Sequence, residues 1–224
     1  MMASKSDNFA AVDDYLGELF APTDSVFAQV LKNCDDAELP AISVTANQGK
    51  LLYLLAKIQR AQSILELGTL GGYSTIWLAR ALPDDGKLVT LEAEATHAEV
   101  AQTNLKIAHV DTLVDLRLGL ALDTLPKLEQ EGAGPFDLIF LDADKPNNPH
   151  YFQWAMKLAR TGSVIIADNV VRQGEVVNAN SSDESVIGVR QLNEMMAAES
   201  HFEVTAIQTV GSKGHDGFAI GIVK

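Results

Sequence analysis

The chain has 224 residues, 47% of them hydrophobic and 21% charged, which fits one large globular domain with a sizeable core and excludes a disordered chain. Its formal net charge of -13 argues against nucleic acid or an anionic membrane surface as a partner, because both favour basic patches. The single cysteine, Cys34, excludes an internal disulfide and a cysteine-based zinc site, and it fits a reducing cytoplasm.

The beginning of the chain is predicted to be helical. Apolar side chains recur at helical spacing over residues 7–20, and a second helix follows Pro22. A third begins at Thr45, which forms a capping-box pattern with Gln48. The sequence has neither the apolar stretch of a signal peptide nor an apolar run of the roughly 18 residues that a membrane span needs. We therefore expect a cytoplasmic protein without membrane contact.

From Ser63 onward, strands and helices alternate. Strands are predicted at 63–67, 87–92, 113–118, 137–142, 163–168, 201–208 and 217–223, with helices over 71–82, 94–109, 120–131, around Trp154 and near 184–200. This alternation predicts an α/β fold with a mostly parallel sheet and helices on both faces. The last two strands are expected to form an antiparallel pair at one edge, joined by a loop over 209–216. We interpret residues 1–60 as a helical extension of one domain, and 61–224 as its main part.

A glycine-rich turn in "ILELGTLGGYST" joins the first strand to a helix, the place where doubly wound sheets bind nucleotide-like ligands. Its glycines are Gly68, Gly71 and Gly72, so the dinucleotide fingerprint lacks its middle glycine, and the lysine of a P-loop is absent. A tight turn without a ligand is the alternative for the glycines alone.

Two acids near this turn indicate which ligand it binds. Glu66 stands one residue before the strand end, where it would repel a pyrophosphate but suit a cation. Glu92 ends the next strand, where an acid commonly binds the hydroxyls of a ribose. Together they favour a cationic adenosine ligand, and S-adenosylmethionine is the obvious candidate.

Polar side chains also follow two later strands. "DLIFLD" ends at Asp142 and leads to Asp144 and Lys145, whereas "SVIIAD" ends at Asp168 and leads to Asn169. If these strands are neighbours, three oxygen donors from Asp142, Asp168 and Asn169 converge, as suits a hard divalent ion such as Mg²⁺. The alternative is that each acid only caps a strand or a following helix.

Four blocks resemble the cation-dependent O-methyltransferases, the group that includes catechol and caffeoyl-CoA O-methyltransferases. They are "ELGTLGGYSTIWLA", "LDADK", "VIIADNVVRQGEVV" and "KGHDGFAIGIV", in the expected order, and the resemblance covers roughly residues 40–224. It implies a Rossmann-like seven-stranded methyltransferase sheet and a homodimer, with the N-terminal extension contributing to the substrate site and to dimer contacts. It also implies S-adenosylmethionine and a divalent cation, either Mg²⁺ or, alternatively, Mn²⁺ or Ca²⁺.

The resemblance also implies roles for individual residues. The expected metal ligands are Asp142, Asp168 and Asn169, and Lys145 is the expected general base or electrostatic partner, acting with Asp142. A surface ion pair is the alternative for Lys145, and Pro146 is expected to bias it toward an extended conformation. The expected cofactor contacts are Glu66, Gly68, Thr69 and Ser74 near the methionine part, Glu92 at the ribose, Ala121 at the adenine, and also Val44, Gly72, Tyr73, Asp142 and Asp144.

The predicted substrate is a small catechol-like vicinal diol. Residues 173–189 carry three acids and no lysine or arginine, which disfavours the phosphates of a coenzyme A thioester. Arg172 is placed to bind a substrate carboxylate, with a solvent-facing role as the alternative.

Three other functions compete with this interpretation. A methyltransferase for 5-hydroxyuridine in tRNA is disfavoured by the negative charge. A cofactor-binding protein without catalysis is disfavoured by the presence of Asp142, Lys145, Asp168 and Asn169. An NAD-dependent oxidoreductase is weakened by the incomplete glycine fingerprint and by Glu66.

Overall fold

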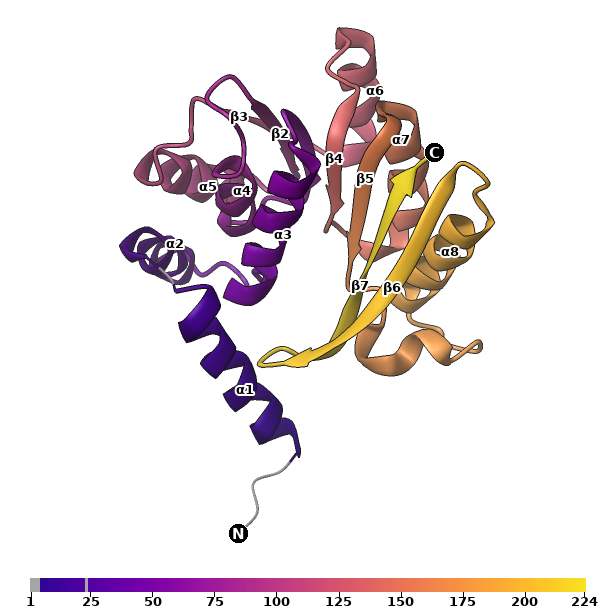
Figure 1. Cartoon of the computed structure of the whole chain (residues 1–224), viewed down its shortest axis with the longest axis horizontal. Helices are drawn as coiled ribbons and strands as arrows, with labels where there is room; N and C mark the ends of the chain where they lie inside the picture. Colours follow the sequence, from indigo (N-terminus) through magenta and orange to yellow (C-terminus); the bar gives the residue numbers. More distant parts are fainter. Residues whose placement is uncertain (1–4, 23) are drawn as a thin grey trace.

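The computed structural model describes residues 5–22 and 24–224. Its centre is a seven-stranded sheet with the strand order β3-β2-β1-β4-β5-β7-β6 (Figure 1). The first five strands are parallel, and β7 runs antiparallel to both β5 and β6. The strands are β1 (Ser63–Leu67), β2 (Lys87–Glu92), β3 (Val114–Leu118), β4 (Phe136–Leu141), β5 (Ala159–Asp168), β6 (Phe202–Gly211) and β7 (Gly214–Val223).

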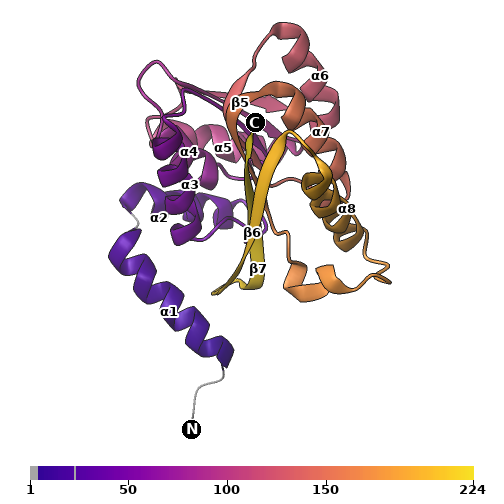
Figure 2. The same cartoon turned by 45° about the vertical axis from the view of Figure 1, so that its right-hand side comes forward.

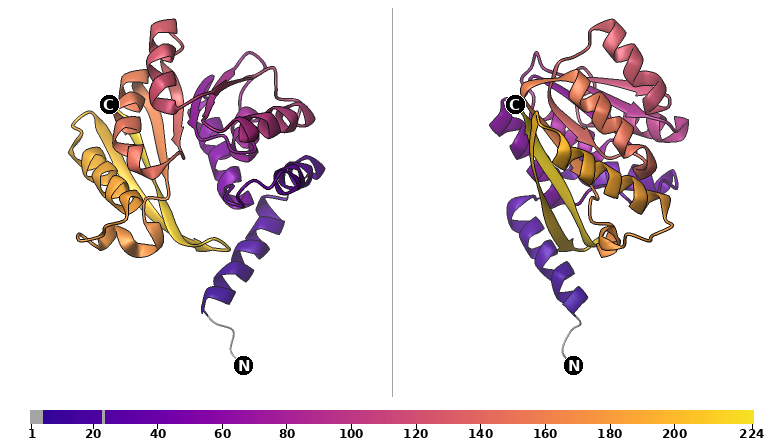
Figure 3. Two further views of the ribbon diagram at one scale, coloured as in Figure 1. Left: turned by 180° about the vertical axis from the view of Figure 1, so that it is seen from behind. Right: turned by 90° about the vertical axis from the view of Figure 1, so that its right-hand side faces the viewer.

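Helices cover both faces of the sheet (Figures 1 and 3). One face carries α3 (Ala46–Gln59), α4 (Tyr73–Ala79) and α5 (Ala95–Ile107), and the other carries α6 (Ala121–Glu131), α7 (Asn148–Leu158) and α8 (Glu184–Ala198). At the N-terminal end, α2 (Ser25–Asp36) packs on α4 and α5. The first helix, α1 (Lys5–Phe20), projects from the body and contacts α3 and β6 (Figure 2). Within the described part of the chain, no helix is both long and apolar enough to span a membrane.

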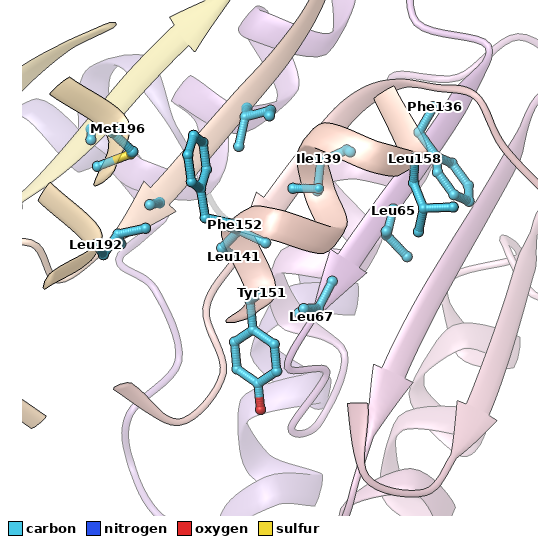
Figure 4. Close-up of a cluster of buried hydrophobic side chains, with 14 of the residues drawn as sticks. Leu65, Leu67, Phe136, Ile139, Leu141, Tyr151, Phe152, Leu158, Leu192 and Met196 are labelled. Carbon is cyan, nitrogen blue, oxygen red and sulfur yellow. The ribbon is translucent and has the colours of Figure 1, made fainter. Parts of the chain in front are cut away.

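Each face of the sheet has its own hydrophobic core. Leu141, Phe152 and Leu192 belong to the cluster between the sheet and α6, α7 and α8 (Figure 4). Ile76 and Phe140 belong to the cluster on the opposite face. Every residue of β4 is buried, because a central parallel strand is covered on both sides and therefore has an almost continuous apolar sequence. This complete burial fixes the point at which the strand ends and polar residues begin.

The predicted sheet and its antiparallel edge are confirmed, and Thr45 caps α3 by accepting a hydrogen bond from the Gln48 amide at 3.2 Å. The predicted loop over 209–216 is wrong, because β6 and β7 continue through it to a two-residue turn at Ser212 and Lys213. Glycines before and after this turn allow it, and Gly214 takes a φ of +90° that suits a residue without a side chain. The strand pairing therefore continues to the tip of a long β6–β7 hairpin.

The strand expected at 163–168 also begins earlier, at Ala159. The pairing of β4 with β5 shifts register between Phe136 and Leu138, so this part of the ladder is irregular. Ser163 stabilises this irregular part, since its hydroxyl donates to the Phe136 carbonyl at 2.6 Å and accepts from the Arg160 amide at 2.9 Å.

Candidate active site

A cavity of about 570 Å³, the first cavity, lies beyond the carboxyl ends of β1, β2 and β4. This edge is where ligands bind in open parallel sheets. Most of the residues expected at the cofactor line it, namely Val44, Gly68, Thr69, Tyr73, Ser74, Glu92, Ala121, Asp142 and Asp144. Glu66 and Gly72 do not line the first cavity and lie behind its wall.

Glu66 is fully buried and organises this wall. Its carboxylate accepts hydrogen bonds from the hydroxyls of Ser74 at 2.7 Å, Thr75 at 2.6 Å and Thr90 at 2.7 Å. Burial raises the pKa of Glu66 to about 7, although the three hydroxyl groups act against this shift. Ser74 lines the first cavity and stands between it and Glu66, and the role of Glu66 as a cofactor contact stays a prediction.

The glycine turn brings two strand ends close together. Gly68 has a φ of +96°, and a Cβ atom there would lie 2.3 Å from the Asp142 carbonyl oxygen. Gly72 precedes α4 with a φ of +85° and packs against Ala101. These glycines are needed because the chain turns in the left-handed region and because the backbone at Gly68 touches the end of β4.

Glu92 is held at the other side of the first cavity. One of its oxygens accepts from the Thr69 amide at 3.2 Å and the Leu70 amide at 2.7 Å, and the other accepts from the Glu94 amide at 3.0 Å. The ring of His97 lies 3.4 Å from this second oxygen and also lines the cavity. The carboxylate is thus fixed in orientation, with remaining acceptor capacity for hydroxyl groups.

The register of β4 and β5 brings the predicted metal ligands together. Leu141 pairs with Ala167, so that Asp142 and Asp168 follow at adjacent strand ends. Asn169 takes a left-handed φ of +57°, and its amide donates to Asp168 Oδ1 at 2.8 Å. The chain therefore turns sharply where the oxygen donors gather.

This arrangement fits a divalent cation. Asp168 is only 5% exposed, and its burial, followed by the neighbouring Asp142 carboxylate, raises the pKa of Asp168 to about 7. Lys145 supplies one positive counter-charge to the two carboxylates, and their oxygen donors are those that Mg²⁺ prefers. Among residues 5–22 and 24–224, no three His, Cys, Asp or Glu side chains form a metal-binding cluster. A cation here would therefore use the side-chain carbonyl oxygen of Asn169 as its third protein ligand.

Lys145 lies beside this pair. Its Nζ donates to Asp142 Oδ1 at 2.8 Å, and the residue is 8% exposed. The prediction that Pro146 holds it extended is wrong, because residues Lys145–Asn147 form the 3-10 helix η1. Asp144 takes the extended conformation instead, with φ -62° and ψ 130°, and the Lys145 carbonyl accepts from the Asn148 amide. Lys145 thus forms a partly buried ion pair rather than the surface pair considered as its alternative.

The position of Lys145 also depends on Gly188 in α8. A Cβ atom at Gly188 would lie 2.2 Å from the Lys145 carbonyl oxygen and 2.8 Å from Pro146 Cα. The helix can therefore approach η1 this closely only where it has no side chain.

We expect Gly188→Ala to lower the free energy of unfolding by about 1–3 kcal/mol, because it forces extra volume between η1 and α8. Denaturant unfolding measures this effect. Gly17→Ala is the matched control, since a Cβ atom there would meet Asn47 Nδ2 only at 3.7 Å. Equal stabilities of the two variants would contradict the prediction.

Tyr151 is a further residue of the first cavity that the sequence did not reveal. Its ring is buried, and Figure 4 shows its hydroxyl pointing away from the hydrophobic cluster. The hydroxyl donates to Asp144 Oδ1, and Asn147 donates to the other oxygen at 2.6 Å. Burial and this carboxylate raise the pKa of Tyr151. Asp144 is therefore held in place by two donors at the rim of the cavity.

A second cavity of about 670 Å³ lies on the other side of the carboxylate pair. It is lined by Asp168, Asn169 and Arg172, and by the tip of the β6–β7 hairpin with Lys213. Asn169 and Arg172 line both cavities, so the cavities adjoin there. Burial lowers the pKa of Lys213, while the charges of Asp142 and Asp168 act against this shift.

Hydrogen bonding fixes the backbone of Arg172 but not its side chain. Its amide donates to Asp216 Oδ1 at 3.0 Å, and its φ is +54°. Its side-chain Nε is buried and has no hydrogen-bond partner among the residues that the structure describes. A guanidinium group in this state at the boundary of two cavities is suited to an anionic ligand group.

Comparisons with known proteins point in one direction. A family model described as O-methyltransferase matches residues 18–217. The catechol O-methyltransferase of Niastella koreensis is 50% identical over 216 residues, which are 96% of this chain and 98% of that protein. The O-methyltransferase of Bacillus cereus, solved in complex with SAH, has a TM-score of 0.96 and 53% identity, covering 97% of this chain and 99% of that one.

A third similar protein is the O-methyltransferase TomG from Streptomyces achromogenes, which is involved in tomaymycin synthesis and was solved in complex with SAM. It has a TM-score of 0.96 and 46% identity, and the match covers 99% of this chain and 100% of that chain. These similarities span both cavities and both strand ends that carry the acids.

Proposed function

The chain belongs to the O-methyltransferase family, and on that premise we propose that it moves the methyl group of S-adenosylmethionine to one hydroxyl of a small catechol-like diol with the help of a divalent cation. One observation carries the proposal: two cavities adjoin at the strand ends that hold Asp142, Asp168 and Asn169. A donor and an acceptor molecule can therefore lie on opposite sides of one cluster of oxygen ligands.

The first cavity is the proposed site of S-adenosylmethionine. Glu92, fixed by backbone amides, would accept the ribose hydroxyls, and Gly68 lets the chain approach the ligand closely. Ser74, oriented by Glu66, would contact the methionine part. Support comes from the similar proteins of Bacillus cereus and Streptomyces achromogenes, which were solved with SAH and SAM.

Asp142, Asp168 and Asn169 are the proposed ligands of the cation, with Mg²⁺ first and Mn²⁺ or Ca²⁺ as alternatives. When bound, the cation would supply Lewis-acid stabilisation of the substrate oxygen that attacks the methyl group. The protein's own contribution is to fix the buried carboxylate of Asp168 and the partly buried carboxylate of Asp142 at the boundary of the cavities, so that both substrates are oriented before reaction.

Lys145 is proposed either to receive the proton of the attacking hydroxyl or, when water takes that proton, to stabilise the phenolate that forms. Transfer forms an oxygen–carbon bond and breaks the methyl–sulfur bond, and the proton of the attacking hydroxyl must leave. The Nζ atom is held by Asp142 at 2.8 Å and lines the first cavity with it. A lysine fixed there can accept that proton when neutral or stabilise the developing phenolate when charged.

We also propose that the protein works as a homodimer in the cytoplasm. Several large apolar side chains of α1 are exposed, namely Phe9, Val12, Leu16 and Leu19. An apolar helix face of this kind is typical of a surface that another chain covers.

Methyl transfer from labelled S-adenosylmethionine tests the function. The protein is incubated with a catechol panel or with unmodified tRNA, each with and without a chelator. We expect label in a catechol only when metal is present. Label in tRNA alone would favour the tRNA methyltransferase, and failure to bind S-adenosylmethionine would reject both activities.

Arg172 predicts a preference among catechols. If its guanidinium binds a substrate carboxylate, Arg172→Gln should lower kcat/KM for 3,4-dihydroxybenzoate about tenfold, as expected for a lost charge-assisted hydrogen bond. The value for unsubstituted catechol should stay within about twofold, so each preparation carries its own control. Equal losses for both substrates would contradict this role.

A further inference from the structure

The tip of the β6–β7 hairpin, residues 211–214, is attached to the N-terminal helix α1. Figures 1 and 3 show this tip beside α1, although the two segments lie at opposite ends of the sequence. Asp13 Oδ2 accepts hydrogen bonds from the Ser212 amide at 3.2 Å and from the Ser212 hydroxyl at 3.0 Å. One carboxylate oxygen thus holds both the backbone and the side chain of the turn.

The same carboxylate is fixed from its other side. Asn47 in α3 donates its Nδ2 to Asp13 Oδ1 at 2.8 Å and to the Asp13 carbonyl at 3.0 Å. The contact also depends on Gly211, because a Cβ atom there would lie 2.7 Å from Asp13 Oδ2. Asp13 therefore connects α1, α3 and the hairpin tip at a point where the tip has no side chain.

This tip forms one wall of the second cavity. Lys213 and Gly214 line the cavity together with Asp168 and Asn169, and Asp13 itself lies on the same wall. Lys213 Nζ also donates to the Ser43 carbonyl, across the loop that precedes α3. The position of the tip therefore sets how the second cavity is closed around a substrate.

Beyond the tip, β7 is connected to the opposite wall of the second cavity. Asp216 Oδ1 accepts from the amides of Val171 at 3.1 Å and Arg172 at 3.0 Å. The His215 amide donates to Gln173 Oε1 at 3.3 Å. A displacement of the hairpin would therefore move both walls of the second cavity.

We propose that Asp13 is a positioning residue for substrate binding, which holds the hairpin tip and Lys213 in place as a wall of the second cavity. The inference rests on the proposed function, since it assigns the second cavity to the substrate. Asp13 lines the second cavity and not the first. A substitution of Asp13 should therefore change the affinity for the substrate and not the affinity for the cofactor.

The test compares Asp13→Ala with Asp14→Ala. Asp14 is the matched control, because it is the adjacent acid in α1 and is exposed, while no hydrogen bond to the hairpin is formed by it among the described residues. For Asp13→Ala we expect KM for catechol to rise about tenfold, as fits the loss of the two hydrogen bonds from Ser212 and the one from Asn47 to a charged acceptor. The dissociation constant of S-adenosylmethionine and kcat should stay within about twofold.

Hydrogen exchange provides a readout that does not depend on methyl transfer. Amides of residues 209–215 should exchange faster in Asp13→Ala than in Asp14→Ala, whereas those of β4 should not change. Ser212→Ala removes only the hydroxyl contact and should give a smaller effect of the same kind, which covers the case that Asp13→Ala does not fold. Adding Ser212→Ala to Asp13→Ala should produce little further change, because both remove the same contact.

Unchanged exchange at the tip in both Asp13→Ala and Ser212→Ala would overturn the inference, as would an equal loss of substrate and cofactor affinity. Calorimetry measures the direct binding of catechol to protein saturated with SAH and Mg²⁺. This measurement separates the positioning role of Asp13 from the proposed methyltransferase function. Catechol binding that weakens in Asp13→Ala supports the positioning role, even if the wild-type protein methylates no catechol and the proposed function fails. Catechol binding that is the same in both proteins rejects the positioning role.

Discussion

Replacing Asp168 with alanine is expected to lower methyl transfer at least about a thousandfold, while S-adenosylmethionine still binds within about twofold of the wild-type affinity. Asp168 lines the second cavity and not the first, so its loss removes a proposed metal ligand without touching the cofactor. Metal ions supply several kcal/mol to such reactions, and each 1.36 kcal/mol corresponds to a factor of ten in rate.

The measurement needs three quantities from the same preparation: the rate of methyl transfer, the affinity for Mn²⁺ and the affinity for S-adenosylmethionine. Asp168→Asn keeps an oxygen donor without the charge and should fall between alanine and the wild type in Mn²⁺ affinity. Asp123→Ala, an exposed acid in the first turn of α6, is the control and should leave all three unchanged. Full activity of the wild-type protein in excess chelator would reject the metal site.

The second large effect is expected for Lys145→Met, which keeps most of the side-chain volume but removes the ammonium group. We expect kcat to fall about 10²–10⁴-fold, the range of general acid–base catalysis. The dissociation constant of S-adenosylmethionine should change little. Single-turnover experiments at saturating cofactor measure the chemical step and exclude an effect on product release.

Lys157→Met is the matched control for this variant. Lys157 Nζ also lies 2.8 Å from a carboxylate, that of Glu129, but this ion pair is on the surface, where such pairs contribute little. The control should retain wild-type kcat. If Lys145→Met kept more than about half of the activity, Lys145 would serve only to neutralise Asp142, and water would have to take the proton.

The sheet and the acids at its edge could be predicted from the sequence because their signals are local. A buried parallel strand has a continuous apolar sequence, so "DLIFLD" and "SVIIAD" show both the strand and the residue at which it ends. The neighbouring positions of Asp142 and Asp168 then follow from the order of the strands. Their roles as metal ligands stay a prediction that the experiments above address.

The local conformation at Lys145 could not be predicted in the same way. The bias of a residue before proline toward extended backbone is a local rule, but the contact with Gly188 of α8 comes from a distant part of the chain. Glu66 is a similar case. Its sequence position placed it near a cation, whereas the hydroxyls that surround it come from α4 and β2.

Other residues of the site had no signal that placed them at a cavity, although Lys213 begins the block "KGHDGFAIGIV". His97 and Tyr151 are single polar residues on helices, without a motif, and they reach the first cavity only through the packing of those helices. Lys213 lay in a segment whose glycines and polar residues are typical of a loop. The exposed outer strand β6 also lacks a clear alternation of apolar residues, so its true end could not be located.

The two cavities are built from different parts of the chain, and this difference affects how the protein can evolve. The first cavity depends on the ends of the parallel strands, whereas the second is also lined by Asp13 of α1, the start of α3 and the tip of an antiparallel hairpin. On the proposed function, mutations in the latter segments would alter the acceptor molecule while the methyl donor is retained. Libraries designed for new acceptors should therefore vary lining residues such as Leu51, Thr209 and Val210, and leave Asp13, Gly211 and the strand ends unchanged.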